Sequence, residues 1–113
     1  MKLLLTSNGI CNNSLKEALY DLAKTKEIST VFITNASNRL NMNKDWLIDD
    51  IYRFKRLGKI DLLDLVSTPK ELWQEKFDNC NVIAFGGGDV AVMNEILESG
   101  FDKDLKKLLN SKV

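Results

Sequence analysis

Three consecutive glycines followed by an acidic residue, Gly86-Gly87-Gly88-Asp89, are the part of this sequence best suited to chemistry. They follow an apolar run, so they predict a turn between a buried strand and a helix. Glycine adopts backbone conformations that a Cβ forbids, and it lets N–H groups approach a ligand closely. At the head of a helix such donors favour a negative ligand. The run therefore indicates a site for a phosphate, a carboxylate or an oxyanion, and a tight turn without a ligand is the alternative.

The same turn also matches, weakly, the dinucleotide-binding pattern Gly86-x-Gly88-x-x-Ala91. That pattern expects a second strand ending in an acidic residue about 20 positions later. Asp102 and Asp104 lie near that distance, but they fall in a predicted helix. A dinucleotide site is therefore the weaker interpretation.

A second candidate site follows the first apolar run of the chain. Ser7 and Asn8 could hydrogen-bond a ligand, or they could form a turn that leads into the next helix. Acidic residues also gather at Asp45, Asp49 and Asp50, but on a predicted helix they indicate a solvated face. The sequence thus predicts no metal site, and nothing in it indicates a cofactor.

Residues that could carry out catalysis are scarce. The sequence contains no histidine, which is the most common general base and metal ligand. Sixteen basic residues balance sixteen acidic ones, which argues against nucleic acid or an anionic membrane as the main partner. Nothing signals export, so Cys11 and Cys80 are expected as free thiols in the cytoplasm.

The elements that must position these residues alternate between strand and helix. Apolar and β-branched runs predict strands at residues 2–6, 29–34, 60–66 and 80–85, each followed by a helical pattern. Such β-α units predict one α/β domain over residues 1–113, with a parallel sheet covered by helices on both faces. Ligands bind such sheets at the carboxyl ends of the strands, where both candidate sites fall.

Local signals predict where the helices begin and end. Ser14 with Glu17, and Thr68 with Glu71, have the spacing of capping boxes at helix starts. Gly58 follows a long helical pattern over residues 43–57 and is predicted to cap its end.

The order of the segments resembles the peptidase E (aspartyl dipeptidase) family of serine peptidases. The resemblance rests on short pieces in the same order: Leu3-Leu4-Leu5-Thr6-Ser7-Asn8-Gly9, Val31-Phe32-Ile33-Thr34-Asn35-Ala36, Asp45-Trp46-Leu47, Leu62-Leu63-Asp64-Leu65 and Val82-Ile83-Ala84-Phe85-Gly86-Gly87-Gly88. It implies a flavodoxin-like core of the class I glutamine amidotransferase type. It also implies that the chain corresponds to the N-terminal half of a family member, truncated after the fourth strand and its helices.

The resemblance implies roles for the glycine turn and the first loop. Gly87 and Gly88 would donate N–H groups to an oxyanion, with Gly86 forming the turn. Ser7, Asn8, Gly86 and Asp89 would contact the substrate, although the family commonly has Asn where this chain has Asp89. The nucleophilic serine elbow belongs after a fifth strand, and the histidine and acidic partner come later still. The intact relative would hydrolyse small peptides, plausibly with N-terminal aspartate or with a cyanophycinase-like specificity, whereas this chain alone would be inactive.

The same resemblance implies a partner. In the family's sheet order the fourth strand would be an exposed apolar edge, which is prone to association. The expected partner is therefore a second copy or a complementing chain, in addition to a small peptide substrate. The alternative function is a non-catalytic module that binds a small anion or nucleotide at residues 86–89.

Overall fold

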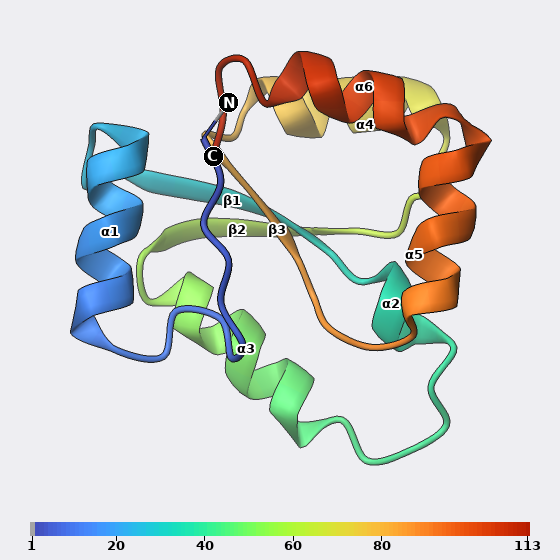
Figure 1. Ribbon diagram of the computed structural model, residues 1–113, viewed down its shortest axis with the longest axis horizontal. Coiled ribbons are helices and arrows are strands. Elements are labelled where there is room, and N and C mark those ends of the chain that lie inside the picture. The colour runs from blue at the N-terminus through green and yellow to red at the C-terminus, as the bar shows by residue number, and fades with distance from the viewer. Residues whose placement is uncertain (1) are drawn as a thin grey trace.

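The computed structural model describes residues 2–113, in which strands and helices alternate along the chain (Figure 1). Three strands form a parallel sheet: β1 (Ile28–Ile33), β2 (Gly58–Leu63) and β3 (Val82–Phe85). The helices are α1 (Asn13–Ala23), α2 (Asn35–Asn38), α3 (Asp45–Lys55), α4 (Lys70–Asp78), α5 (Val90–Ile96) and α6 (Asp102–Leu108), with the π-helical segment η1 (Leu97–Phe101) before α6. The α/β architecture with a parallel sheet is as predicted.

Strand β1 lies at the centre of the sheet, in the order β2-β1-β3. Its side chains point alternately to opposite faces. Phe32 packs with Leu19 of α1 and Phe54 of α3, whereas Ile33 packs with helices of the other face, including Phe77 of α4. In Figure 1, α3 lies below the strands and α4 and α6 lie above them. Burial on both faces explains why the second half of β1, Val31 to Ile33, is continuously apolar.

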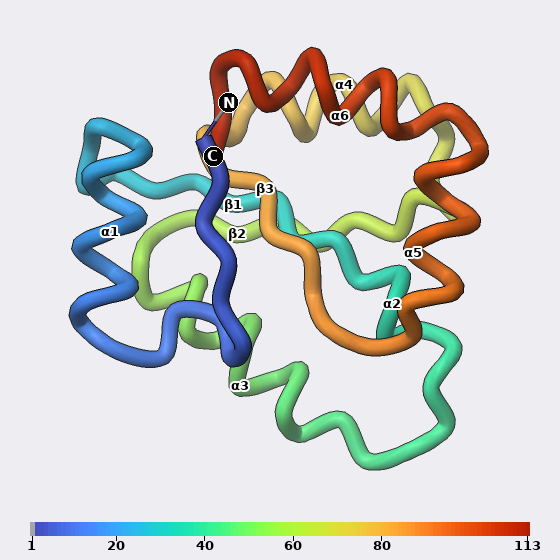
Figure 2. Tube along the Cα trace, in the orientation of Figure 1, coloured from blue at the N-terminus to red at the C-terminus, as the bar shows by residue number. Residues whose placement is uncertain are grey.

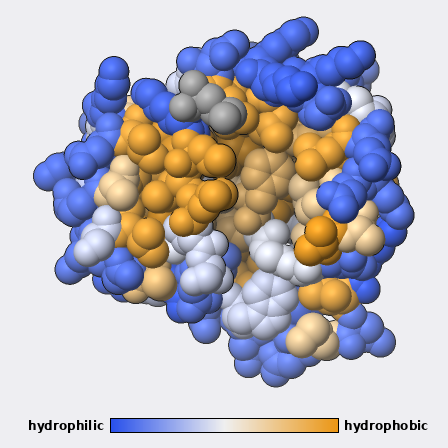
Figure 3. All heavy atoms as spheres, viewed as in Figure 1, coloured by the Kyte–Doolittle hydropathy of each residue, from blue (hydrophilic) through white to orange (hydrophobic). Residues whose placement is uncertain are grey.

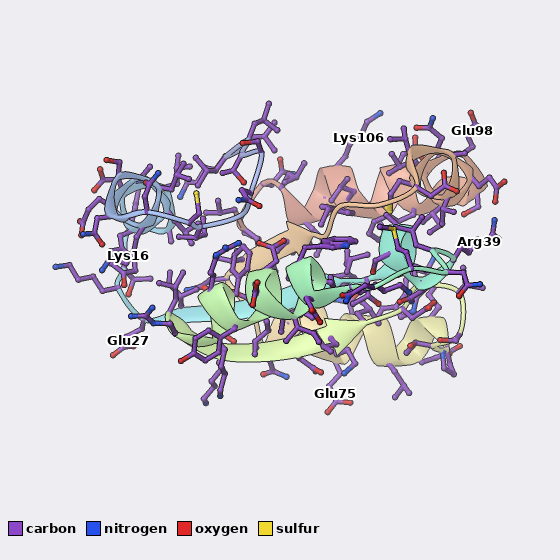
Figure 4. All side chains as sticks on the ribbon, turned by 90° about the horizontal axis from the view of Figure 1, so that it is seen from below. Lys16, Glu27, Arg39, Glu75, Glu98 and Lys106 are labelled. Carbon is purple, nitrogen blue, oxygen red and sulfur yellow. The ribbon has the colours of Figure 1, made fainter. Side chains whose placement is uncertain are left out.

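The two outer strands differ in their exposed residues. β2 carries Lys59 and Asp61, both exposed, and Asp61 pairs with Lys76 of α4 at 2.6 Å. β3 is apolar throughout and lies at the opposite edge, as predicted. Charged side chains elsewhere extend outward, among them Lys16 and Lys106 (Figure 4). Within residues 2–113 no helix combines the length and apolarity needed to cross a lipid bilayer.

The predicted strand at residues 2–6 was wrong. These residues form no ladder; they run as an irregular segment along the open side of β3 (Figure 2). A strand needs a neighbour whose N–H and C=O groups it can pair with. Here a cleft separates the segment from β3, so its apolar residues have no partner strand.

The predicted start of the first helix was also wrong. Asn12 is the N-cap, and its side-chain oxygen accepts a hydrogen bond from the Leu15 N–H at 2.9 Å. The predicted cap, Ser14, lies inside α1. The helix begins two residues earlier, with Asn12 accepting one of its orphan donors, so the capping box is not formed.

Gly58 does not cap the preceding helix, which ends with Arg56 as its C-cap. Gly58 instead begins β2 with φ +156°, and a Cβ on it would lie 2.0 Å from the carbonyl oxygen of Ile28. The glycine is required because the two strands approach closely at this point.

Thr68 does not cap helix α4 either. The N-cap position belongs to Pro69, which offers no side-chain hydrogen bond. The carbonyl of Thr68 accepts a hydrogen bond from the indole N–H of Trp73 at 2.8 Å. The loop before α4 is thus held by a tryptophan.

Candidate functional site

The glycine turn after β3 is held by backbone hydrogen bonds at its two ends, whereas the two N–H groups in its middle have no acceptor in the part of the protein that the structure describes. The N–H of Gly86 donates to the carbonyl oxygen of Ile33 at 3.1 Å, and the N–H of Asp89 donates to that of Ala36 at 2.7 Å. Within residues 2–113, the N–H groups of Gly87 and Gly88 have no protein acceptor. Both glycines are exposed, so the turn offers two backbone donors to a ligand or to water.

Two of the three glycines are needed where they stand, for different reasons. A Cβ on Gly86 would lie 2.7 Å from the ring of Phe32, and a Cβ on Gly88 would lie 2.2 Å from the Ala36 carbonyl oxygen. Gly88 also has φ +142°, a conformation that side chains disfavour. A Cβ on Gly87 would meet only Trp46, at 3.9 Å. Gly86 and Gly88 therefore hold the turn, and Gly87 faces open space.

Asp89 serves the helix that follows. Its carboxylate accepts a hydrogen bond from the Ala91 N–H at 2.9 Å, which makes it the N-cap of α5. An acidic N-cap is favourable because it satisfies an orphan donor at the positive end of the helix. The predicted contact of Asp89 with a substrate stays a prediction.

A cleft of about 360 Å³ lies between the N-terminal segment and β3. It brings together residues from both predicted sites: Ser7 and Asn8 line it on one side, and Gly87 lines it on the other. Gly86, Gly88 and Asp89 do not line it. The rest of the lining is apolar apart from Thr6 and Asp50: Leu3, Leu4, Leu5, Gly9, Ile10, Leu19, Trp46, Phe54, Val82, Ile83, Ala84, Phe85, Leu105, Leu109 and Val113. Hydrophobic residues surround this hollow in Figure 3.

Asp50 of α3 also lines the cleft, so the prediction that it belongs to a solvated face was wrong. Its side chain is only 15% exposed, and its Oδ1 is buried without a hydrogen-bond partner within residues 2–113. A Cβ on Gly9 would lie 1.9 Å from that oxygen, so the glycine makes room for the carboxylate. Arg53 lies 4.0 Å from it. Burial raises the pKa of Asp50, and the Arg53 charge offsets part of that rise.

A pattern in the sequence could have identified Asp50. It lies three residues after Leu47 and four before Phe54, which places it on the buried stripe of α3. Arg53 also donates to the carbonyl oxygen of Asn8 at 3.3 Å, so it links α3 to the loop of the first candidate site.

A second polar cluster stands at the carboxyl end of β2 and is structural. The carboxylate of Asp64 accepts four hydrogen bonds, from the side chains of Asn35 and Asn38 and from the backbone N–H groups of Val66 and Ser67. Burial acts to raise the pKa of Asp64, but these bonds together outweigh it and lower that pKa. The cluster holds together the loops that follow β1 and β2.

The assembled site offers the free N–H groups of Gly87 and Gly88, the hydroxyls of Thr6 and Ser7, the Asn8 amide and the Asp50 carboxylate. The sequence holds no histidine. Comparisons with protein-family models, with curated proteins and with solved structures found no match.

Proposed function

We propose that this chain is the oxyanion-binding half of a peptidase E-type serine hydrolase, built on a flavodoxin-like core of the class I glutamine amidotransferase type. The observation that most supports this is the pair of free N–H groups at Gly87 and Gly88, at the carboxyl end of an apolar parallel strand. Two adjacent backbone donors are what a developing oxyanion requires.

The substrate of the complete enzyme would be a small peptide, plausibly with N-terminal aspartate. Ser7 and Asn8 support this assignment because they share the cleft with Gly87 and can hydrogen-bond a polar group bound there. In the proposed enzyme the nucleophile and base lie outside residues 1–113, on a segment that complements this half. We place it in the cytoplasm, where Cys11 and Cys80 would remain free thiols, as they are here.

The alternative proposal is a binding module without catalysis, which holds a small anion or nucleotide at residues 86–89. The same two free donors support it, since a phosphate oxygen would accept from them equally well. Asp89 weighs against a highly charged ligand, because its negative carboxylate stands beside the turn and already accepts from the Ala91 N–H at the start of α5.

Backbone NMR of the ¹⁵N-labelled chain separates these proposals. The first probe is a phosphinate analogue of an aspartyl dipeptide, whose tetrahedral anion mimics the oxyanion, and the second is ATP. The hydrolase proposal expects the phosphinate to shift the amide resonances of Gly87 and Gly88 and expects no effect of ATP. Shifts with ATP alone would favour the binding module. Silence of both resonances up to about 10 mM of either probe, above the weakest range of specific binding, would exclude both.

Two variants sharpen this experiment. Asp89→Asn keeps an N-cap side chain but removes a negative charge beside the turn, so phosphinate should bind more tightly, by up to about tenfold. Asp21→Asn makes the same change on the exposed side of α1 and should leave binding unaltered. Equal effects of the two substitutions would mean that the anion does not bind at the turn.

A further inference from the structure

One residue of an additional strand already lies on the open edge of β3. The N–H of Val113 donates to the carbonyl oxygen of Asn81 at 3.1 Å, and the carbonyl oxygen of Val113 accepts from the Ile83 N–H at 2.8 Å. Two bonds that flank one residue, here Val82, are the pattern of a parallel ladder. The Val113 side chain is buried with Phe54 in the cluster on the α1 and α3 face.

The edge continues beyond Val113 without a partner strand in residues 2–113. N–H groups along a strand point alternately to its two sides. Since the Ile83 N–H points toward Val113, the Phe85 N–H and the Ile83 carbonyl point toward the same open side. Phe85 is also 41% exposed, which is unusual for a large apolar residue in a strand.

The cleft beside this edge has the walls of a strand position inside a sheet. Phe54 and Leu19 border it from one layer of helices, and Leu105 and Leu109 border it from the other. Among its lining residues Asp50 is the only ionisable one within residues 2–113. Figure 3 shows the hollow flanked by hydrophobic side chains. Such walls suit an uncharged strand that is apolar on both faces.

We propose that this cleft binds an extended, uncharged peptide segment as a strand parallel to β3. The strand would run from the position of Val113 toward the glycine turn. Its residue opposite Ala84 would donate its N–H to the Ile83 carbonyl and accept from the Phe85 N–H. Main-chain pairing of this kind gives affinity, and the apolar walls select the side chains.

The inference rests on the open edge and the cleft, and it does not require the proposed hydrolase function. If both hold, a side chain carried just past the inserted strand would lie near Gly87, Ser7 and Asn8. The two proposals can fail separately, because one is reported by the amides of Gly87 and Gly88 and the other by the amide of Phe85.

The test uses the whole chain and an acetylated, amidated peptide, Val-Ile-Val-Gly-Lys-Lys, whose lysines come after the residues that would pair with β3. Hydrogen exchange at the Phe85 amide, followed by NMR, should slow on binding because that N–H gains an acceptor. A second peptide carries an N-methyl group on the isoleucine, which would lie opposite Ala84. It should bind at least about tenfold more weakly, since its nitrogen cannot donate to the Ile83 carbonyl.

A matched pair of variants locates the site on the protein. Leu109→Lys puts a charge into the cleft and should weaken binding at least about tenfold. Leu72→Lys makes the same change on α4, where the leucine is 48% exposed and does not line the cleft, and should have no effect. If Leu109→Lys does not fold, the two peptides still decide the question on the unaltered chain.

Three results would overturn the proposal. The first is unchanged Phe85 exchange at millimolar peptide. The second is equal binding of the N-methylated peptide. The third is Phe85 protection without peptide that grows with protein concentration, which would show that a second copy of the chain takes the cleft.

Discussion

Replacing Gly88 by alanine is the sharpest test of how the glycine turn is built. Its φ of +142° is open to glycine and strained for alanine. The new Cβ would lie 2.2 Å from the carbonyl oxygen of Ala36 and 2.8 Å from the nitrogen of Ser37. Both atoms belong to the backbone of α2, so no side chain can rotate away to relieve the contact.

The cost follows from two separate effects. A residue held in a sparsely populated backbone region costs about 1–3 kcal/mol. Relieving the overlap would also move the Ala36 carbonyl, which accepts the Asp89 N–H at 2.7 Å, and a weakened hydrogen bond adds about 1 kcal/mol. Gly88→Ala should therefore lower the free energy of unfolding by about 2–4 kcal/mol, a large part of the 5–15 kcal/mol typical of small proteins.

Gly87→Ala is the matched control, since its Cβ would meet only Trp46 at 3.9 Å. It should change the free energy of unfolding by less than about 1 kcal/mol, in either direction. Urea unfolding followed by tryptophan fluorescence measures both variants against the unaltered chain. Equal midpoints for Gly88→Ala and the unaltered chain, or an equal loss in both variants, would refute the assignment of Gly88 as the residue that holds the turn.

Four further substitutions test polar groups by urea unfolding. Asp64→Asn should lower the free energy of unfolding at neutral pH by about 1–3 kcal/mol. Because the pKa of Asp64 is lowered in the folded state, the difference in stability between variant and unaltered chain should vanish as the pH falls from about 3.9 through the folded pKa. Asp61→Asn is the control, because it breaks one surface ion pair and should lower the free energy of unfolding by less than about 1 kcal/mol. An equal loss in Asp61→Asn and Asp64→Asn would contradict the structural role of the Asp64 cluster. The Asp50→Asn variant should be more stable than the unaltered chain at pH 7. Because the pKa of Asp50 is raised in the folded state, the gain in stability should shrink in acid as Asp50 takes up its proton. A gain that persists below pH 3 would contradict a raised pKa. Thr30→Val should raise the free energy of unfolding by about 1 kcal/mol, since the buried hydroxyl has no partner within residues 2–113, and a loss would indicate that it has one.

The strands of the sheet could be predicted because their signal is local. The β-branched run at 29–34 overlaps β1, and the apolar run at 80–85 contains β3. The first and last residues of both strands lie within two positions of the predicted ones. The run at 2–6 has similar composition and no ladder. The difference is the absence of an adjacent strand, which is a property of the assembled fold and is not encoded in the five residues themselves.

The position of part of the candidate site could be predicted from the expected topology of the sheet. Ser7, Asn8 and Gly87 were expected near one another because carboxyl ends of parallel elements share one side of a sheet, and they line one cleft. Asp50 was predicted to face solvent because it is charged and lies close to two other acidic residues, Asp45 and Asp49, on the same predicted helix. Its spacing from Leu47 and Phe54 indicated the buried stripe of α3 instead, and the packing of α3 against Gly9 shows that this carboxylate points inward.

The unequal edges of the sheet limit the size of any complex that forms by strand addition. Lys59 and Asp61 expose charges on β2, which disfavours the docking of a further strand there. Growth into a fibre needs an acceptor edge at each end of the repeating unit. With one receptive edge, the chain should saturate at a single added strand, so titration with the peptide should reach a stoichiometry of one to one and scattered light should not increase.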